Sequence, residues 1–319
     1  MIQFNVFNNE ITHIDNFPIT SRSIFISTLP GLEVSHDSVW WPNMAITREL
    51  NILITGGARG IGRELFRHFL RSGHRILVID SNEEKLAYIS EKLPRWSGGG
   101  NGRAVIIKWD PRNRDSIKNI VKSAQAIFDG RLDVLINNAM TMPRFWSNGK
   151  AIDDLSEAIM EEWDTKIAIG LTAPFLISRL CVPLLKAGGT EPPQGCIVNI
   201  SSTRACKSGP NHEAHSAARA GLLGLTQSMS VSLGHAHKIR VNAILLGWIH
   251  VVTDNRSVYE SRVELNDELK GKDMKWHPTG RVGMVQDVFK AVEYLMGAEF
   301  VTGQEIVLDG GVESKMIYP

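Results

Sequence analysis

Cysteine is scarce in this chain. Three cysteines occur among its 319 residues, Cys181, Cys196 and Cys206, and no two of them stand close together in the sequence. Their number and spacing exclude a disulfide framework of the kind that stabilises small secreted domains, and favour free thiols in a reducing compartment. The first residues also lack a basic segment followed by an apolar core, which a secretory signal would have. We therefore expect a cytoplasmic protein.

An excess of charge of either sign is missing as well. The 35 lysines and arginines nearly balance the 34 aspartates and glutamates, for a formal net charge of +1. This balance argues against broad electrostatic binding to nucleic acid or to an anionic membrane. No apolar run approaches the ~20 residues that a membrane-spanning helix needs. The ten histidines show no metal-ligand spacing. We expect a small-molecule substrate, and no metal, nucleic acid or membrane as a partner.

Residues 1–47 differ in composition from the rest of the chain. They hold several aromatic residues, among them Phe4, Trp40 and Trp41, between prolines and glycines that are typical of turns. A fully disordered tail would not usually contain so many aromatics. We weigh two interpretations equally: an arm that packs on its own domain or on a partner subunit, and a poorly ordered extension. Residues 48–319 then form the single folded domain.

The rest of the chain is arranged around a glycine-rich stretch, residues 50–62, with the sequence LNILITGGARGIG. An apolar run at residues 52–54 predicts a strand, the glycines predict a tight turn, and residues 65–70 have the apolar spacing of a helix. A second apolar run ends at Asp80, roughly 20 residues beyond the glycines. Glycines that let main-chain N–H groups approach a pyrophosphate, followed by a carboxylate for a ribose, are typical of a dinucleotide site.

Further apolar runs predict more strands, and helical patterns separate them. The predicted strands cover residues 104–109, 132–136, 196–200, 240–245 and 304–308, and the predicted helices cover 82–93, 116–128, 156–186, 214–233 and 285–295. Residues 247–279 predict a long polar segment with a few helical turns. Alternating strands and helices indicate an α/β fold, a Rossmann-type doubly wound parallel sheet in one domain with an N-terminal extension. Ligands of such folds bind beyond the carboxyl ends of the strands.

With these motifs in this order, the chain resembles the short-chain dehydrogenase/reductase family over about residues 48–311. The resemblance rests on TGGARGIG at 55–62, Asp110, NNA at 137–139, ISS at 200–202, RVN at 240–242, and GQ at 303–304 with DGG at 309–311. It implies NAD or NADP as cofactor and a homodimer or homotetramer. The positions that it implies for cofactor binding are Gly56, Ala58, Arg59, Gly60, Ile61, Gly62, Asp80, Asp110, Asn137, Ala139 and Arg219.

Two residues bear on the choice between NAD and NADP. Asp80 would accept hydrogen bonds from a ribose 2′-hydroxyl and repel a 2′-phosphate, which favours NAD. Arg59 could pair with that phosphate, which leaves NADP open. Because Ser81 and Asn82 supply no further cation, we favour NAD.

The catalytic positions depart from the family's pattern. The family uses an asparagine, a serine and a Tyr-x-x-x-Lys pair on a helix. Here Ser202 is kept, but the pair falls on His215 and Arg219, and the asparagine position falls on Gly170. The resemblance thus implies a cofactor site of the usual kind beside an altered catalytic set.

Loops expected to border the substrate also depart from the family. Met140 replaces the glycine that follows Asn-Asn-Ala, and Leu246 replaces a proline. We expect Met140, Trp248 and His250 to contact a small to medium, partly apolar substrate, and the aromatic residues in these loops suggest one of secondary metabolism.

The replacements leave three functions open. An unperturbed imidazole titrates near pH ~6.5, so His215 could give a proton. The charge of Arg219 would disfavour the protonated ring, which suits His215 better to hydrogen bonding or to accepting a proton. We predict an NAD(P)(H)-dependent oxidoreductase acting on a carbonyl, alcohol or imine. The alternatives are a non-redox isomerase, cyclase or dehydratase that keeps the cofactor structurally, and a catalytically inactive dinucleotide-binding scaffold.

Overall fold

The computed structural model describes residues 48–97, 102–186, 194–251 and 271–315. The predicted N-terminal arm, residues 1–47, lies outside the described residues. Residues 252–270, which make up most of the polar segment predicted over residues 247–279, also lie outside the described residues.

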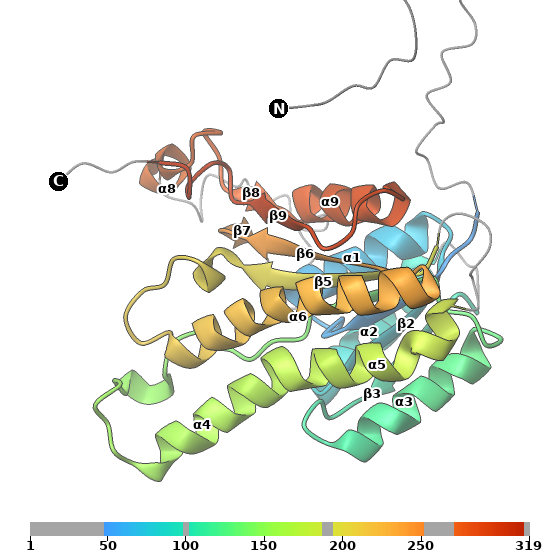
Figure 1. The fold of residues 1–319 in the computed structure, drawn as a ribbon, viewed down its shortest axis with the longest axis horizontal. Coiled ribbons are helices and arrows are strands. Elements are labelled where there is room, and N and C mark those ends of the chain that lie inside the picture. Colours follow the sequence, from blue (N-terminus) through green and yellow to red (C-terminus); the bar gives the residue numbers. More distant parts are fainter. Residues whose placement is uncertain (1–47, 98–101, 187–193, 252–270, 316–319) are drawn as a thin grey trace, which may run out of the picture. The chain divides into compact units, whose positions relative to one another are not determined.

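A seven-stranded parallel sheet forms the centre of the folded domain (Figure 1). Its strand order is β3-β2-β1-β4-β5-β6-β9, which is the doubly wound order. The strands are β1 (Asn51–Thr55), β2 (Arg75–Asp80), β3 (Ala104–Lys108), β4 (Val134–Asn137), β5 (Cys196–Ser202), β6 (Arg240–Leu246) and β9 (Glu305–Leu308). The predicted fold class is therefore confirmed. The order reverses between β1 and β4, so a crevice for a ligand is expected at their carboxyl ends.

Helices cover both faces of the sheet, because successive strand residues point to opposite faces. Ile52 and Ile54 pack with α1 (Gly60–Arg71), α2 (Glu83–Trp96) and α9 (Val285–Gly297). Leu53 packs on the other face with α3 (Arg114–Ile127) and α5 (Ala173–Lys186). The helix α6 (Glu213–His237) lies beside α5 on that second face (Figure 1).

The helix predicted over residues 156–186 is continuous but changes its geometry midway. It consists of α4 (Glu157–Ile167), the π-helical turn η2 (Ala168–Thr172) and α5. By length and composition, Glu157–Lys186 could cross a bilayer. In the fold its C-terminal part, α5, packs on the sheet, where Ala173, Ile177 and Cys181 are fully buried.

The C-terminal part contains a small second sheet that the sequence did not predict. The strand β7 (Ile249–His250) pairs in parallel with β8 (Gly283–Met284), and α8 (Gly271–Trp276) precedes β8. Two-residue strands produce no apolar alternation, so the sequence pattern had no signal for them.

Candidate functional site

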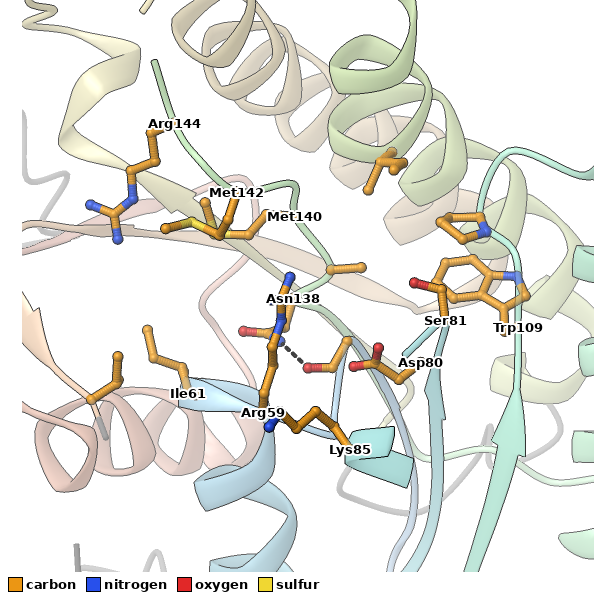
Figure 2. Close-up of a pocket in the computed structure, with 16 residues that line it drawn as sticks. Arg59, Ile61, Asp80, Ser81, Lys85, Trp109, Asn138, Met140, Met142 and Arg144 are labelled. Atoms are coloured by element: carbon orange, nitrogen blue, oxygen red, sulfur yellow. Dashed lines mark hydrogen bonds between the residues drawn. The ribbon is translucent and has the colours of Figure 1, made fainter. Parts of the chain in front are cut away.

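A cavity lies at the carboxyl ends of β1 to β4 (Figure 2). Its walls come from the β1–α1 loop, the ends of β2 and β3, the loop after β4, η2 and the residue after β7. The lining residues are Gly56, Arg59, Gly60, Ile61, Asp80, Ser81, Lys85, Trp109, Pro111, Asn138, Ala139, Met140, Met142, Arg144, Ile169 and Val251. Most of the residues predicted to hold a dinucleotide therefore meet around one space.

Glycine at position 62 lets α1 pack against the residues that follow β4. A Cβ at Gly62 would lie 2.5 Å from Asn138 Nδ2, and closer still to the carbonyl oxygen of Gly56. These two groups hydrogen-bond to each other at 3.0 Å. At Gly60, where φ is +54°, a Cβ would meet nothing within 4 Å. The first turn of α1 thus borders open space, and its N–H groups, which have no intrahelical partner, suit a pyrophosphate.

Asp80 both lines the cavity and closes the β1–α1 loop. Its Oδ2 accepts a hydrogen bond from the Ala58 N–H, and its Oδ1 accepts one from the Asn82 N–H, each at 3.0 Å. Ala58 itself is fully buried behind the lining. Among the described residues the guanidinium of Arg59, which borders the same cavity, has no carboxylate partner. A carboxylate suited to ribose hydroxyls and a cation suited to a phosphate therefore face one space.

Asn137 directs its side chain away from the cavity. Its Nδ2 donates to Ser178 Oγ at 3.0 Å and to Asn199 Oδ1 at 2.8 Å, inside the core. The next residue, Asn138, lines the cavity instead. Strand alternation could have told these two asparagines apart, because neighbouring side chains point to opposite faces.

Asp110 is not among the residues that line the cavity. Its Oδ1 pairs with Arg112 Nε at 3.1 Å. The Arg112 guanidinium holds the pKa of the Asp110 carboxyl below its usual range. Its neighbours Trp109 and Pro111 line the cavity in its place.

The end of β5 contacts Arg219 of α6 through Ile200 and Ser201, the two residues before Ser202. Arg219 is buried, and its Nη1 donates to the carbonyl oxygen of Ile200 at 2.9 Å. The hydroxyl of Ser201 donates to the carbonyl oxygen of Arg219 at 3.1 Å. Ser202 follows directly, and its Oγ accepts the Arg204 N–H at 3.2 Å. The hydroxyl proton of Ser202 is therefore available to a ligand.

Gly170 lies beside Arg219, where the family's asparagine is missing. A Cβ at Gly170 would stand 2.9 Å from the Ala218 Cβ and 3.8 Å from Arg219 Nη2. The guanidinium thus occupies the neighbourhood of the absent amide. Burial, with a contribution from the charge of Arg144, lowers the pKa of Arg219 to about 10. Arg219 still carries its charge at neutral pH.

His215 precedes Arg219 by one turn on the same side of α6. It is 4% exposed, and its Nε2 has no hydrogen-bond partner within the described part of the chain. Burial, followed by the charges of Arg219 and Arg144, lowers the pKa of His215 to about 3. The ring is therefore neutral at pH 7, as we expected from the charge of Arg219. Burial is the larger cause, and it is visible only in the fold.

The lowered pKa of His215 predicts a fold that loses stability on acidification. A histidine in the unfolded chain titrates near pH ~6.5. Below that pH the unfolded chain binds a proton that folded His215 does not take up until about pH 3. Stability from this group is thus fully present above pH ~6.5 and is lost as the pH falls towards the folded pKa. From about pH 7.5 to about pH 5.5, the free energy of unfolding should fall by about 1 kcal/mol on this account.

Urea unfolding of the wild type and of His215→Gln at both pH values measures this difference. The acid-induced loss should be smaller in His215→Gln, whereas His237→Gln, at the end of the same helix, should behave as the wild type does. An equal loss in all three proteins would mean that folded His215 takes up a proton as readily as the unfolded chain does.

Of the three predicted substrate residues, only Met140 lines the cavity. Trp248 is 46% exposed, and its ring centroid lies 6.3 Å from that of His277. His250 lies in β7 and is also absent from the lining, while Val251 is part of it. In this segment Val251, and neither Trp248 nor His250, reaches the cavity.

Two lining residues beyond Met140 had no signal in the sequence. Figure 2 shows Met142 and Arg144 with Met140 at one end of the cavity, away from Asp80 and Trp109. The family motif that the sequence matches ends at Ala139, so it contained no information about the side chains at positions 142 and 144.

This doubly wound sheet with its glycine-rich cradle defines a nucleotide-binding α/β domain. The family profile described as enoyl-(acyl carrier protein) reductase matches residues 56–313. The chain belongs to the short-chain dehydrogenase/reductase family, and accordingly to its NAD(P)-dependent oxidoreductases.

This chain matches several relatives over nearly the whole of their length. An uncharacterized oxidoreductase of Thermotoga maritima is 34% identical over 270 residues, which cover 83% of this chain and 96% of that protein. A subunit of a (2S)-[(R)-hydroxy(phenyl)methyl]succinyl-CoA dehydrogenase from Thauera aromatica is 32% identical, with coverage of 81% and 94%. The solved structure of an apo short-chain oxidoreductase from Clostridium thermocellum has a TM-score of 0.66 at 30% identity, with coverage of 85% and 95%.

Proposed function

We propose that this protein transfers hydride between NAD or NADP and a small to medium, partly apolar carbonyl, alcohol or imine, using Ser202, His215 and Arg219 at the reacting end. The observation that carries the proposal is the β5–α6 contact. Hydrogen bonds join Arg219 to the end of the strand that carries Ser202. The same fold has a glycine-rich turn at the cavity that fits a pyrophosphate. When bound, the dinucleotide supplies or accepts the hydride.

The roles of the three residues follow from their hydrogen bonds and charges. Ser202 can donate its hydroxyl proton to a substrate oxygen, because its Oγ already accepts the Arg204 N–H. Arg219, buried and charged, stabilises negative charge that develops on that oxygen, and such stabilisation is strong where water is excluded. His215 is neutral and carries a buried Nε2, so it serves as a hydrogen-bonding group or proton acceptor rather than as an acid.

Transient absorbance of the reduced nicotinamide, followed with a panel of ketones, alcohols and imines, tests this function. We expect a substrate-dependent change in that signal with the wild type. Ser202→Ala should lower the rate by about 100-fold or more, as loss of a positioned catalytic donor does. Turnover of a substrate with no change in the nicotinamide signal would contradict the redox function and favour a structural cofactor. If calorimetry detects binding of neither NAD nor NADP, the proposed dinucleotide-dependent activity is contradicted altogether.

The cofactor choice gives a separate prediction. Asp80→Asn keeps an oxygen to accept the Ala58 N–H but removes the charge that repels a 2′-phosphate. We expect it to weaken NAD binding and to improve NADP binding, while Arg59→Gln should weaken NADP binding alone by about tenfold. Fluorescence titrations of both reduced cofactors measure this, and a loss of NAD affinity in Arg59→Gln equal to that of NADP would contradict it.

A further inference from the structure

The loop that carries Arg144 is fixed to the helices around the reacting end. Trp146 Nε1 donates to Glu213 Oε2 at 2.8 Å, and the Trp146 N–H donates to the carbonyl oxygen of Asn211 at 3.0 Å. From the other side, Lys166 Nζ donates to the carbonyl oxygen of Phe145 at 2.7 Å. These bonds attach the loop to the start of α6 on one side and to α4 on the other. Arg144 therefore projects from an anchored loop into the cavity (Figure 2).

A second arginine, Arg204, stands directly beside Ser202. It lies in the single 3₁₀ turn η3 (Thr203–Ala205), and its N–H is bonded to Ser202 Oγ. Its guanidinium packs over Gly209, where a Cβ would come 2.5 Å from Nη1. Glycine at that position makes room for the guanidinium near the end of β5.

Neither arginine has a carboxylate partner among the described residues. The nearby acids are already engaged, since Glu162 binds Lys166 at 2.7 Å and Glu213 accepts the Trp146 indole N–H. The charge of Arg204 adds to burial in lowering the pKa of Arg144. Arg219 adds a third positive charge, and its pKa is lowered by the charge of Arg144 as well as by burial. Arg144 is exposed and Arg204 is half-buried, so an anion in solution can reach both guanidinium groups, and binding it would offset the repulsion between these like charges.

We propose that Arg144 and Arg204 together bind an oxyanionic group of the substrate, a carboxylate or a phosphate, beside Ser202. Two guanidinium groups offer paired N–H donors that match the oxygens of either anion. Met140 and Met142, next to Arg144 in the cavity wall, would contact an apolar part of the same molecule. The inference rests on the proposed function, since the anion would belong to the molecule that is oxidised or reduced. It narrows that substrate to an anionic one.

Calorimetric titration of the NAD- or NADP-saturated protein with benzoate, phenyl phosphate and neutral benzamide tests the inference. At least one of the two anions should bind about tenfold or more tightly than benzamide. The tighter of the two identifies carboxylate or phosphate as the preferred group. Arg144→Gln and Arg204→Gln should each weaken that anion by about tenfold, with partial recovery in Arg144→Lys. Arg59→Gln is the control, because that arginine borders the cavity on the cofactor's side, and it should leave the anion's affinity unchanged.

Equal affinity for benzamide and both anions would overturn the inference, and so would unchanged anion binding in Arg144→Gln and Arg204→Gln. An equal loss in Arg59→Gln would place the anion at a cofactor phosphate and overturn it too. Thermal unfolding of each variant checks that the fold is retained. The assay involves no turnover, so a failed redox test and a failed anion test are distinguishable.

Discussion

Gly62→Ala should weaken binding of NAD or NADP by about 10- to 100-fold, because overpacking at this position costs ~1–3 kcal/mol. The new methyl group would stand 2.5 Å from Asn138 Nδ2 and would also overlap the carbonyl oxygen of Gly56. Those two groups hydrogen-bond to each other, and Asn138 Nδ2 also donates to the carbonyl oxygen of Thr55 at 3.1 Å. To admit the methyl group, α1 must move away from the strand ends and carry the pyrophosphate-binding turn with it.

Gly224→Ala is the control for this prediction. A methyl group at Gly224, on α6 and outside the cavity lining, meets no atom within 4 Å, so it should leave cofactor binding unchanged. Fluorescence titration with reduced cofactor compares the two variants, and thermal unfolding shows whether each is folded. If the two variants bind the cofactor equally well, the close contact between α1 and the Asn138 side chain does not shape the site.

Restoring the family's asparagine, as Gly170→Asn, should destabilise the fold by about 1–3 kcal/mol. Its Cβ would already lie 2.9 Å from the Ala218 Cβ, and the amide beyond it would extend towards Arg219 Nη2. The two departures from the family's pattern, glycine at position 170 on η2 and arginine at position 219 on α6, are therefore neighbours in space. We expect the destabilisation to be partly relieved when Arg219→Lys removes the branched guanidinium.

The test is a double-mutant cycle by urea unfolding, which isolates the coupling between the two positions. We expect a favourable coupling of about 1 kcal/mol or more, as is usual for residues in contact. Gly224→Asn, at a glycine of α6 with nothing within 4 Å of its Cβ position, should be nearly neutral. Strictly additive effects of Gly170→Asn and Arg219→Lys would show that the two replacements arose independently of each other's packing.

The sheet was predictable from sequence because its strands are buried on both faces. Residues 52–54 and 76–79 form continuous apolar runs, and such runs separated by helical patterns leave one common topology. What sequence could not decide is the direction of single side chains. Asn137 and Asn138 occupy one motif, but the first enters the core and the second lines the cavity.

The candidate site shows the same division. The resemblance located Ser202, His215 and Arg219, and spacing alone placed the last two on one side of α6. It could not supply the burial of His215, which depends on the Trp146 loop and α4 packing against α6. No sequence motif contains Arg144 or Arg204, so the sequence pointed to neither. The homo-oligomer stays a prediction.

Transfer of deuterium to the product from NADH or NADPH that carries deuterium at both C4 positions, followed by mass spectrometry, tests the central claim most directly. The account predicts one deuterium on the reduced carbon per turnover, with Gly62→Ala losing this transfer through weakened cofactor binding. Product that forms at the wild-type rate without deuterium would contradict the account, since the dinucleotide would then be structural and Ser202, His215 and Arg219 would serve a non-redox reaction.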